Sequence, residues 1–244
     1  ISAAGVEACA VPTAVLSTHT GGFKGYTYRD LTSDMRPFAR HWHELGLSFD
    51  AIYTGFLGSE EQLEIVGEMF DAFRTPDNLI MVDPVMADNG ELYATFPSDF
   101  PKGMAKLCAK ADLIIPNITE ACLLTGQPYT EGPFERPYIE ELLKKLSDLG
   151  PHCVILTGVC FDEDTLGAAC YTSEDGKISY AMSSRVEGMY HGTGDVFGSA
   201  LLGALMKGFG LGEAAQIAVD FVTDAIIRTK AAGNPTNYGV NFEE

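Results

Sequence analysis

The sequence predicts an α/β protein of three layers, in which a mostly parallel sheet carries helices on both faces. Strand-like apolar runs alternate with amphipathic helical runs, which is the rhythm of β-α-β units. Most of the apolar runs are continuous rather than alternating, as expected for strands that are buried on both faces. Late in the chain, residues 166–173 and 177–186 flank the turn at 174–176, which predicts an antiparallel hairpin.

The expected elements follow one another without a repeat or a linker, which indicates a single domain over residues 1–244. Strands are expected at 8–17, 50–57, 78–85, 112–117 and 153–158. Helices are expected at 34–46, 59–74, 98–110 and 135–149, with two longer ones at about 195–208 and 212–230. Gly150 ends the fourth helical pattern, as glycine does at many helix C-termini.

Composition excludes several classes of partner. Lys plus Arg number 16 and Asp plus Glu number 34, so the formal net charge is −18. Nucleic acids and anionic membranes both need a basic footprint, which this chain lacks. No apolar run approaches the ~20 residues that span a bilayer. The six cysteines form no CxxC pair, so we expect reduced core thiols in a cytoplasmic protein.

Polar residues follow each expected parallel strand. The segments are STHTGG, TGFLGS, DPVMADNG, PNITE and TGV, in chain order. Parallel sheets bind ligands beyond the carboxyl ends of their strands, so the five segments predict a ligand site at one edge.

The glycine-rich turn HGTGDVF leads into an apolar helix. Gly192 and Gly194 leave no side chain in the way of a phosphate, and the N–H groups of a helix N-terminus favour an anion. Asp195 directly follows them. It is either a catalytic carboxylate or an ordinary N-cap of the helix, and the residues alone leave both interpretations open.

Five further polar residues occur at strand ends or in turns close by. Asp83 and Asp88 suggest Mg²⁺ held largely through water, although aspartates also stabilise turns. Glu120 suggests a further water-mediated contact to Mg²⁺, with Asn117 near nucleotide phosphates, although a glutamate in the first turn also suits the helix dipole. Thr157 could reach a phosphate oxygen or simply end its strand.

The segment 17–20 offers three hydroxyls around one imidazole: Ser17, Thr18, His19 and Thr20. Such a cluster suggests recognition of a small polar ligand, with low specificity.

Together these segments resemble the ribokinase-like superfamily and, within it, the pyridoxal (vitamin B6) kinases. The resemblance runs nearly end to end through VLSTHTG, YTGFLGS, DPVMADNGELY, PNITEACLLTG and GTGDVF. The GTGD motif marks only the superfamily, whereas STHTG together with DPVMADNGELY is more specific.

The resemblance implies ATP-dependent phosphorylation of the 5′-hydroxymethyl group of pyridoxal, pyridoxine or pyridoxamine. It makes Asp195 the catalytic base and makes Gly192, Thr193 and Gly194 the anion hole. It places Asp83 and Glu120 at Mg²⁺; near the nucleotide phosphates it places Asn117, Thr157 and Asp88. Thr20, Phe56, Ser17 and His19 are the expected substrate contacts. A homodimer is implied as well, and a requirement for a monovalent cation such as K⁺ stays open.

Two departures and three rivals qualify the resemblance. Phe56 stands where the family often has tyrosine, and the family's first strand and loop are expected to be lacking. A hydroxymethylpyrimidine kinase is the nearest rival, but it typically has cysteine where Asp195 stands; dual specificity stays open. A sugar or nucleoside kinase would carry an early β-lid that this sequence lacks. The rival of another class is a non-catalytic ligand-binding relative.

Overall fold

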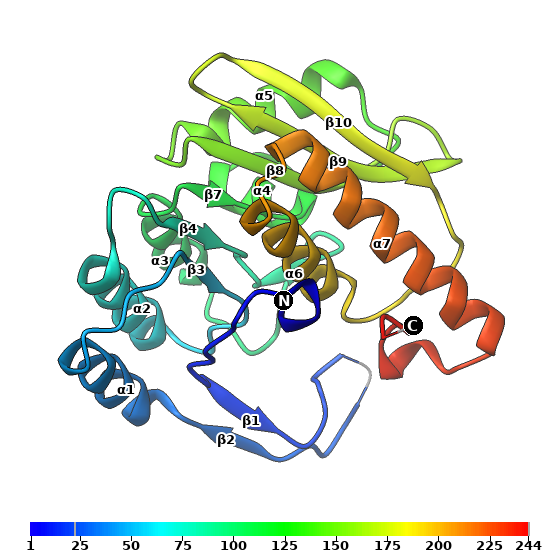
Figure 1. Ribbon diagram of the computed structural model, residues 1–244. Coiled ribbons are helices and arrows are strands. Elements are labelled where there is room, and N and C mark those ends of the chain that lie inside the picture. Colours follow the sequence, from blue (N-terminus) through cyan, green and yellow to red (C-terminus); the bar gives the residue numbers. More distant parts are fainter. Residues whose placement is uncertain (22, 244) are drawn as a thin grey trace.

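A six-stranded sheet forms the centre of the computed structural model, which describes residues 1–21 and 23–243 (Figure 1). Its strand order is β10-β9-β8-β7-β4-β3. The strands are β3 (Ala51–Thr54), β4 (Leu79–Val82), β7 (Leu113–Ile114), β8 (Cys153–Val159), β9 (Thr165–Thr172) and β10 (Lys177–Ser184). The first four run parallel, whereas β9 and β10 are antiparallel. The parallel sheet and its late hairpin are therefore confirmed.

Helices cover both faces of this sheet, which explains why its strands read as continuous apolar runs. Ile80 and Val82 point into a core shared with the helices on one face, while Met81 points into the core on the other. The first face packs against α1 (Thr32–Glu44), α2 (Glu60–Phe73), α3 (Phe100–Cys108), α4 (Ile118–Thr125) and α5 (Arg136–Ser147). The second face packs against α6 (Thr193–Met206) and α7 (Leu211–Ala232).

The strand expected at 8–17 is wrong in length and in place. Only Ala14–Leu16 is extended (β1), and it pairs antiparallel with β2 (Tyr28–Asp30) in a hairpin outside the central sheet. Val15 is 58% exposed, so the apolar run is not buried on both faces. The hairpin extends below the main body in Figure 1. Before it, the short 3-10 helix η1 (Ser2–Ala4) contacts α6.

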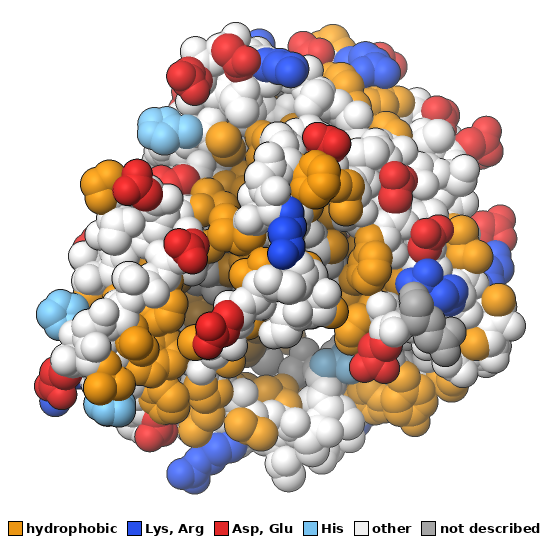
Figure 2. Space-filling model, viewed as in Figure 1, with side chains coloured by type: hydrophobic (Ala, Val, Ile, Leu, Met, Phe, Trp, Pro, Cys, Tyr) orange, Lys and Arg blue, Asp and Glu red, His pale blue; other side chains and the backbone are white. Residues whose placement is uncertain are grey.

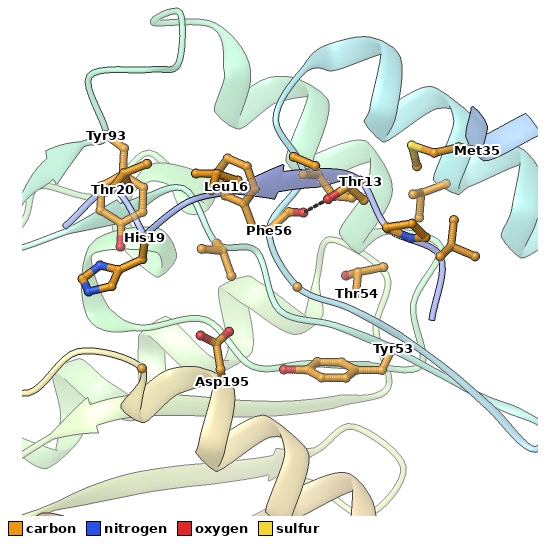
Figure 3. A pocket seen from close by; sticks show the side chains of 18 of the residues that line it. Thr13, Leu16, His19, Thr20, Met35, Tyr53, Thr54, Phe56, Tyr93 and Asp195 are labelled. Atoms are coloured by element: carbon orange, nitrogen blue, oxygen red, sulfur yellow. Dashed lines mark hydrogen bonds between the residues drawn. The ribbon is translucent and has the colours of Figure 1, made fainter. Parts of the chain in front are cut away.

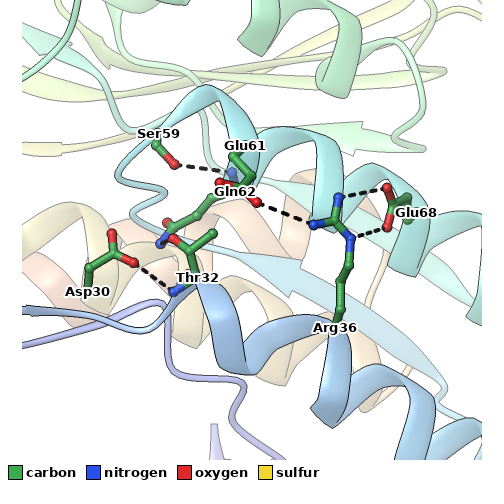
Figure 4. Close-up of polar contacts among 7 residues, drawn as sticks. All are labelled: Asp30, Thr32, Arg36, Ser59, Glu61, Gln62 and Glu68. Carbon is green, nitrogen blue, oxygen red and sulfur yellow. Dashed lines mark hydrogen bonds and ion pairs between the residues drawn. The ribbon is translucent and has the colours of Figure 1, made fainter.

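A buried glutamine anchors the base of this hairpin (Figure 4). The Gln62 amide donates to the carbonyl oxygen of Thr13 at 3.0 Å and to the hydroxyl of Thr32 at 2.9 Å. Its oxygen accepts a hydrogen bond from the N–H of Gly58 at 2.7 Å. One side chain from α2 thus fixes the entry of the hairpin, the start of α1 and the loop after β3.

A second small hairpin follows β4. Strands β5 (Ala87–Asp88) and β6 (Glu91–Leu92) pair around Asn89 and Gly90, whose φ angles are 51° and 81°. Two left-handed residues form the tight turn that suits a two-residue hairpin, and Asn-Gly is its preferred sequence. Asp88, expected in a turn, is instead the last residue of β5 and pairs with Glu91, and the turn itself is formed by Asn89 and Gly90. The two short strands were not predicted.

All six cysteines are free thiols. Cys108, Cys122, Cys160 and Cys170 are buried, as expected for core thiols, whereas Cys9 is exposed. Among the described residues, no helix is long and apolar enough to cross a lipid bilayer.

Candidate active site

The carboxyl ends of the four parallel strands meet along one edge of the sheet. The N–H of Asp83, after β4, donates to the carbonyl oxygen of Thr54 at the end of β3 (3.2 Å). The N–H of Thr157 in β8 donates to the carbonyl oxygen of Pro116, after β7 (2.9 Å). Four of the five segments predicted to share this edge therefore do so, and the fifth reaches it from the β1–β2 hairpin.

A cavity of about 1090 Å³ opens at this edge, between the hairpin, β3 and the N-terminus of α6. Hydrophobic side chains gather around the hollow in Figure 2, and Figure 3 shows its lining from close by. Six of the predicted site residues line it: His19, Thr20, Phe56, Asp88, Gly192 and Asp195. The volume far exceeds one aromatic ring and lies at the upper end of the usual range for ligand sites.

The N-terminus of α6 has the features expected of an anion site. Gly192 is the N-cap residue with φ 78°, a left-handed conformation that glycine adopts without strain. Among the described atoms, none lies within 4 Å of where a Cβ would stand at Gly192 or Gly194. The N–H groups of Thr193, Gly194 and Asp195 belong to the first helical turn, where no preceding turn supplies acceptors. The loop therefore presents to open space N–H groups that have no acceptor within residues 1–21 and 23–243.

Asp195 is not the N-cap of this helix. It is the third helical residue, and no side chain of the described residues caps the N-terminus. Its carboxylate points into the cavity in Figure 3. The residue remains exposed toward the cavity, and the surrounding protein partly desolvates the carboxyl and raises its pKa. The geometry removes the capping interpretation and leaves a carboxylate that faces a ligand space.

Asp83 and Glu120 form a buried pair of carboxylates behind this loop. They are 7% and 3% exposed. Burial, followed by the charges of Glu120 and Asp195, raises the pKa of Asp83, and burial raises the pKa of Glu120. In the described part of the chain, no lysine or arginine forms an ion pair with either of them.

This pair fits a divalent cation held mostly by other ligands. Within residues 1–21 and 23–243, no group of three or more His, Cys, Asp or Glu side chains could hold a metal alone. Mg²⁺ usually keeps several waters and takes one or two carboxylates together with substrate phosphates. Asp83 and Glu120 supply hard oxygen donors of that kind, with no protein cation to compensate their charge.

Glu120 and Asn117 also have a structural role. They form a capping box at the start of α4: Asn117 Oδ1 accepts from the N–H of Glu120, and Glu120 Oε2 accepts from the N–H of Asn117, both at 2.9 Å. Glu120 Oε1 accepts from the N–H of Met86 at 3.0 Å. Asn117 Nδ2 donates to the carbonyl oxygen of Ala87 at 2.8 Å. These side chains hold together the loops that frame the site.

Thr157 and Asp88 have local partners as well. The Thr157 hydroxyl donates to the carbonyl oxygen of Pro116 at 3.3 Å. The carboxylate of Asp88 is exposed and accepts from the backbone and side-chain nitrogens of Asn89 at 2.9 and 3.1 Å. Asp88 still lines the cavity, whereas Thr157 does not.

The hairpin loop supplies only part of the predicted substrate contacts. Ser17 does not line the cavity, because its hydroxyl accepts a hydrogen bond from the N–H of Thr27 across the hairpin (2.9 Å). His19 accepts from the N–H of Gly21 at Nδ1, so its Nε2 donates to the carbonyl oxygen of Asn237 (2.6 Å). The aromatic surface of Phe56 and the hydroxyl of Thr20 border the cavity.

Several further cavity residues were not predicted as site residues, and among them are three hydroxyl-bearing residues of the motifs YTGFLGS and DPVMADNGELY. Tyr53, Thr54 and Tyr93 line the cavity and are drawn in Figure 3. Thr54 is 6% exposed, and its hydroxyl has no hydrogen-bond partner in the described part of the chain. Tyr53 and Thr54 belong to an apolar strand, so periodicity marks them as core. Only their position at the carboxyl end of β3 could have singled them out.

Comparison with known proteins identifies the family. The family described as phosphomethylpyrimidine kinase matches residues 1–240 of the chain. The chain belongs to this family. A Staphylococcus aureus family member, provisionally named pyridoxine kinase, is 31% identical over 188 residues, which are 75% of this chain and 64% of that protein. This chain thus spans less than two thirds of that relative's length.

Solved structures of the family have the same fold. A Bacteroides thetaiotaomicron protein, provisionally named phosphomethylpyrimidine kinase and crystallised with pyridoxal, superposes with a TM-score of 0.94 at 38% identity. The match covers 99% of this chain and 85% of that one. Pyridoxal kinase from Lactobacillus plantarum gives a TM-score of 0.90 at 31% identity, with the same coverage of both chains. The ribokinase-like fold expected from the motifs is confirmed.

Proposed function

We propose that this protein is an ATP-dependent kinase that phosphorylates the 5′-hydroxymethyl group of pyridoxal, pyridoxine or pyridoxamine. One observation carries the proposal: the carboxylate of Asp195 stands beside backbone N–H groups that are unpaired in the described part of the chain, at the mouth of a large cavity. A phosphoryl acceptor and an anion can therefore meet at one point. The relative crystallised with pyridoxal and the relatives named as pyridoxal or pyridoxine kinases support the choice of substrate.

In the proposed reaction, Asp195 orients the substrate hydroxyl in line with the γ-phosphate and accepts its proton. Phosphoryl transfer has a loose transition state, so a carboxylate within hydrogen-bond reach is a sufficient base. The desolvation that raises the pKa of Asp195 makes it a stronger proton acceptor than a fully solvated aspartate. The base and the hydroxyl thus need only correct placement.

The backbone around Gly192, Thr193 and Gly194 holds the transferring group. N–H groups at a helix N-terminus stabilise charge that develops on phosphoryl oxygens, and they are already oriented before the reaction. Asp83 and Glu120 would hold Mg²⁺, mostly through water, and the ion would neutralise phosphate charge. Asp88 lies on the cavity wall, where we place the nucleotide phosphates. The capping box of Asn117 and Glu120 fixes the loop behind it.

The proposed substrate ring lies against Phe56, with Thr20 and His19 over it from the hairpin. Phe56 offers a stacking face and no hydroxyl, so ring orientation depends on hydrogen bonds from the hairpin loop. Hydroxymethylpyrimidine, also a six-membered ring that carries a hydroxymethyl group, is the second candidate substrate, favoured by the family described as phosphomethylpyrimidine kinase. The aspartate at position 195 favours the B6 vitamers.

A panel assay tests the proposal directly. The protein is incubated with ATP, Mg²⁺ and, in turn, pyridoxal, pyridoxine, pyridoxamine and hydroxymethylpyrimidine, and ADP and the phosphate ester are quantified. We expect turnover with the three vitamers and a kcat/KM for hydroxymethylpyrimidine at least about tenfold lower. Binding of pyridoxal without ADP release would overturn the kinase assignment in favour of a ligand-binding protein. Preference for the pyrimidine would reverse the substrate assignment.

A further inference from the structure

Tyr53 lies near Asp195, the proposed base, although the two residues are far apart in the sequence. It occupies the third position of β3, and its side chain packs on the α6 face of the sheet. A Cβ built on Gly198 would stand 3.0 Å from the Tyr53 Cζ and would clash with its hydroxyl. Gly198 follows Asp195 by three residues, so both lie on the same face of α6. The phenol is therefore wedged against the helix one turn beyond the carboxylate.

Neither the Tyr53 hydroxyl nor the Asp195 carboxylate has a hydrogen-bond partner among the described residues. The Tyr53 hydroxyl is turned toward Asp195 in Figure 3. A tyrosine hydroxyl usually finds an acceptor where it leaves solvent, and Tyr53 is half-buried. The carboxylate of Asp195 is exposed toward the cavity, and closure of the site around a ligand would leave it in need of a donor.

We infer that Tyr53 is a positioning residue, whose hydroxyl donates a hydrogen bond to the ionised carboxylate of Asp195 and holds it toward the substrate. This inference rests on the proposed function of Asp195. Burial, followed by the charges of Asp83 and Asp195, raises the pKa of Tyr53, so the phenol keeps its proton and remains a donor at working pH. Catalytic hydrogen bonds are often long without ligands and shorten in the complex.

Other titratable groups lie near Asp195, and a test has to distinguish their effects on its carboxyl from the effect of Tyr53. Those that line the same cavity or lie close to the pair are Asp83, Asp88, Glu120, Tyr26, Tyr93, Tyr238, Cys9, His19 and His191. Tyr93 is one of three other phenols in the lining, and its hydroxyl lies on the hairpin side, near His19 and Thr20, in Figure 3.

The test compares Tyr53→Phe with Tyr171→Phe, a half-buried strand tyrosine that does not line the cavity. The first readout is the ¹³C chemical shift of the Asp195 carboxyl, assigned through Asp195→Asn and titrated in the ligand-free protein. We expect Tyr53→Phe to raise the titration midpoint of Asp195 by about one pH unit, because a donor to the charged form is lost. Tyr171→Phe leaves the midpoint unchanged.

The second readout is the pH profile of kcat. We expect Tyr53→Phe to lower kcat by up to about tenfold on the acid side of the profile, with recovery as pH rises and with both KM values within about twofold. A loss of kcat without an upward shift of the Asp195 midpoint would overturn the inference, as would an unchanged kcat. If the wild type phosphorylates none of the panel, the proposed function fails, while the carboxyl titration still decides whether Tyr53 and Asp195 are hydrogen-bonded.

Discussion

The two sides of the candidate site differ in how their polar groups are used. Around α4, Asn117, Glu120 and Thr157 have their polar atoms engaged by neighbouring loops. Around the N-terminus of α6 and the end of β3, Asp195, Tyr53 and Thr54 have no such partners among the described residues, and of the three it is the Thr54 hydroxyl that is fully buried. Buried polar groups are nearly always hydrogen-bonded, so exceptions require an explanation. The satisfied side holds the site in shape, and the unsatisfied side faces the ligand.

The largest effect is expected on the unsatisfied side. Asp195→Asn should lower kcat by at least about 100-fold, since it removes the general base, while the Kd for an ATP analogue changes by less than about threefold. In the wild type, kcat should fall on the acid side with a pKa above that of an ordinary aspartate, because burial raises the pKa of Asp195. Steady-state kinetics across pH provide the measurement.

Asp224→Asn is the matched control for Asp195→Asn, since Asp224 is exposed on α7. It should leave kcat unchanged. If the Asp195→Asn enzyme keeps more than a tenth of wild-type turnover, Asp195 is not the general base, and the division between the two sides fails.

Substitutions on the satisfied side should lower the stability of the protein. Asn117→Ala removes the N-cap of α4 and the donor to Ala87, so the free energy of unfolding should fall by about 2 kcal/mol. Asn117→Ser keeps a capping oxygen and should recover about half of that loss. Urea unfolding of both variants measures the difference. Equal losses in the two would show that the cap contributes nothing.

The buried carboxylates behind the loop should make stability depend on pH. The pKa values of Asp83 and Glu120 are raised in the folded protein, so their contribution is fully present below about pH 4 and is lost as pH rises through the folded values. The ligand-free protein should therefore become less stable between about pH 5 and pH 8. Asp83→Asn removes one charge and should be more stable than wild type at pH 8 by about 1 kcal/mol.

Thermal melts at pH 5 and pH 8, with and without Mg²⁺ and ATP, check this expectation. The ligands should raise the Tm of the wild type more than that of Asp83→Asn, because binding to the folded state is linked to stability. Parallel pH dependences in the two proteins would contradict the assignment of the slope to this pair.

The smallest effect compares two threonines at strand ends. Thr54→Val removes a buried hydroxyl that has no partner, so the free energy of unfolding without ligand should change by less than about 0.5 kcal/mol. Thr157→Val removes a hydroxyl that donates to the carbonyl oxygen of Pro116 and should cost about 1 kcal/mol. Denaturant unfolding of Thr54→Val and Thr157→Val measures the difference in the free energy of unfolding between the two variants. A larger loss for Thr54→Val would place Thr54 on the satisfied side.

Several elements were predictable from local chemistry. The continuous apolar runs around Met81 and Ile155 marked strands with a core on each side, and the EDG turn at 174–176 marked the late hairpin. The apolar run at 8–17 was interpreted by the same rule, which wrongly predicted a strand of the central sheet. An apolar run forms a buried strand only where helices cover both faces of the sheet. β1 lies in a separate hairpin, and Val15 on its outer face is exposed to solvent.

The sequence alone determined the layer architecture, the glycine turn before α6 and the presence of Asp195 behind it. These follow from periodicity and from the backbone freedom of Gly192 over a few neighbouring residues. Only the tertiary structure decided which polar groups are already bonded. It assigned Asn117 to a cap, turned Ser17 to its own hairpin, and brought Tyr53 beside Asp195 from a strand more than 140 positions away. A hydrogen-bond partner is set by position in space, which periodicity does not encode.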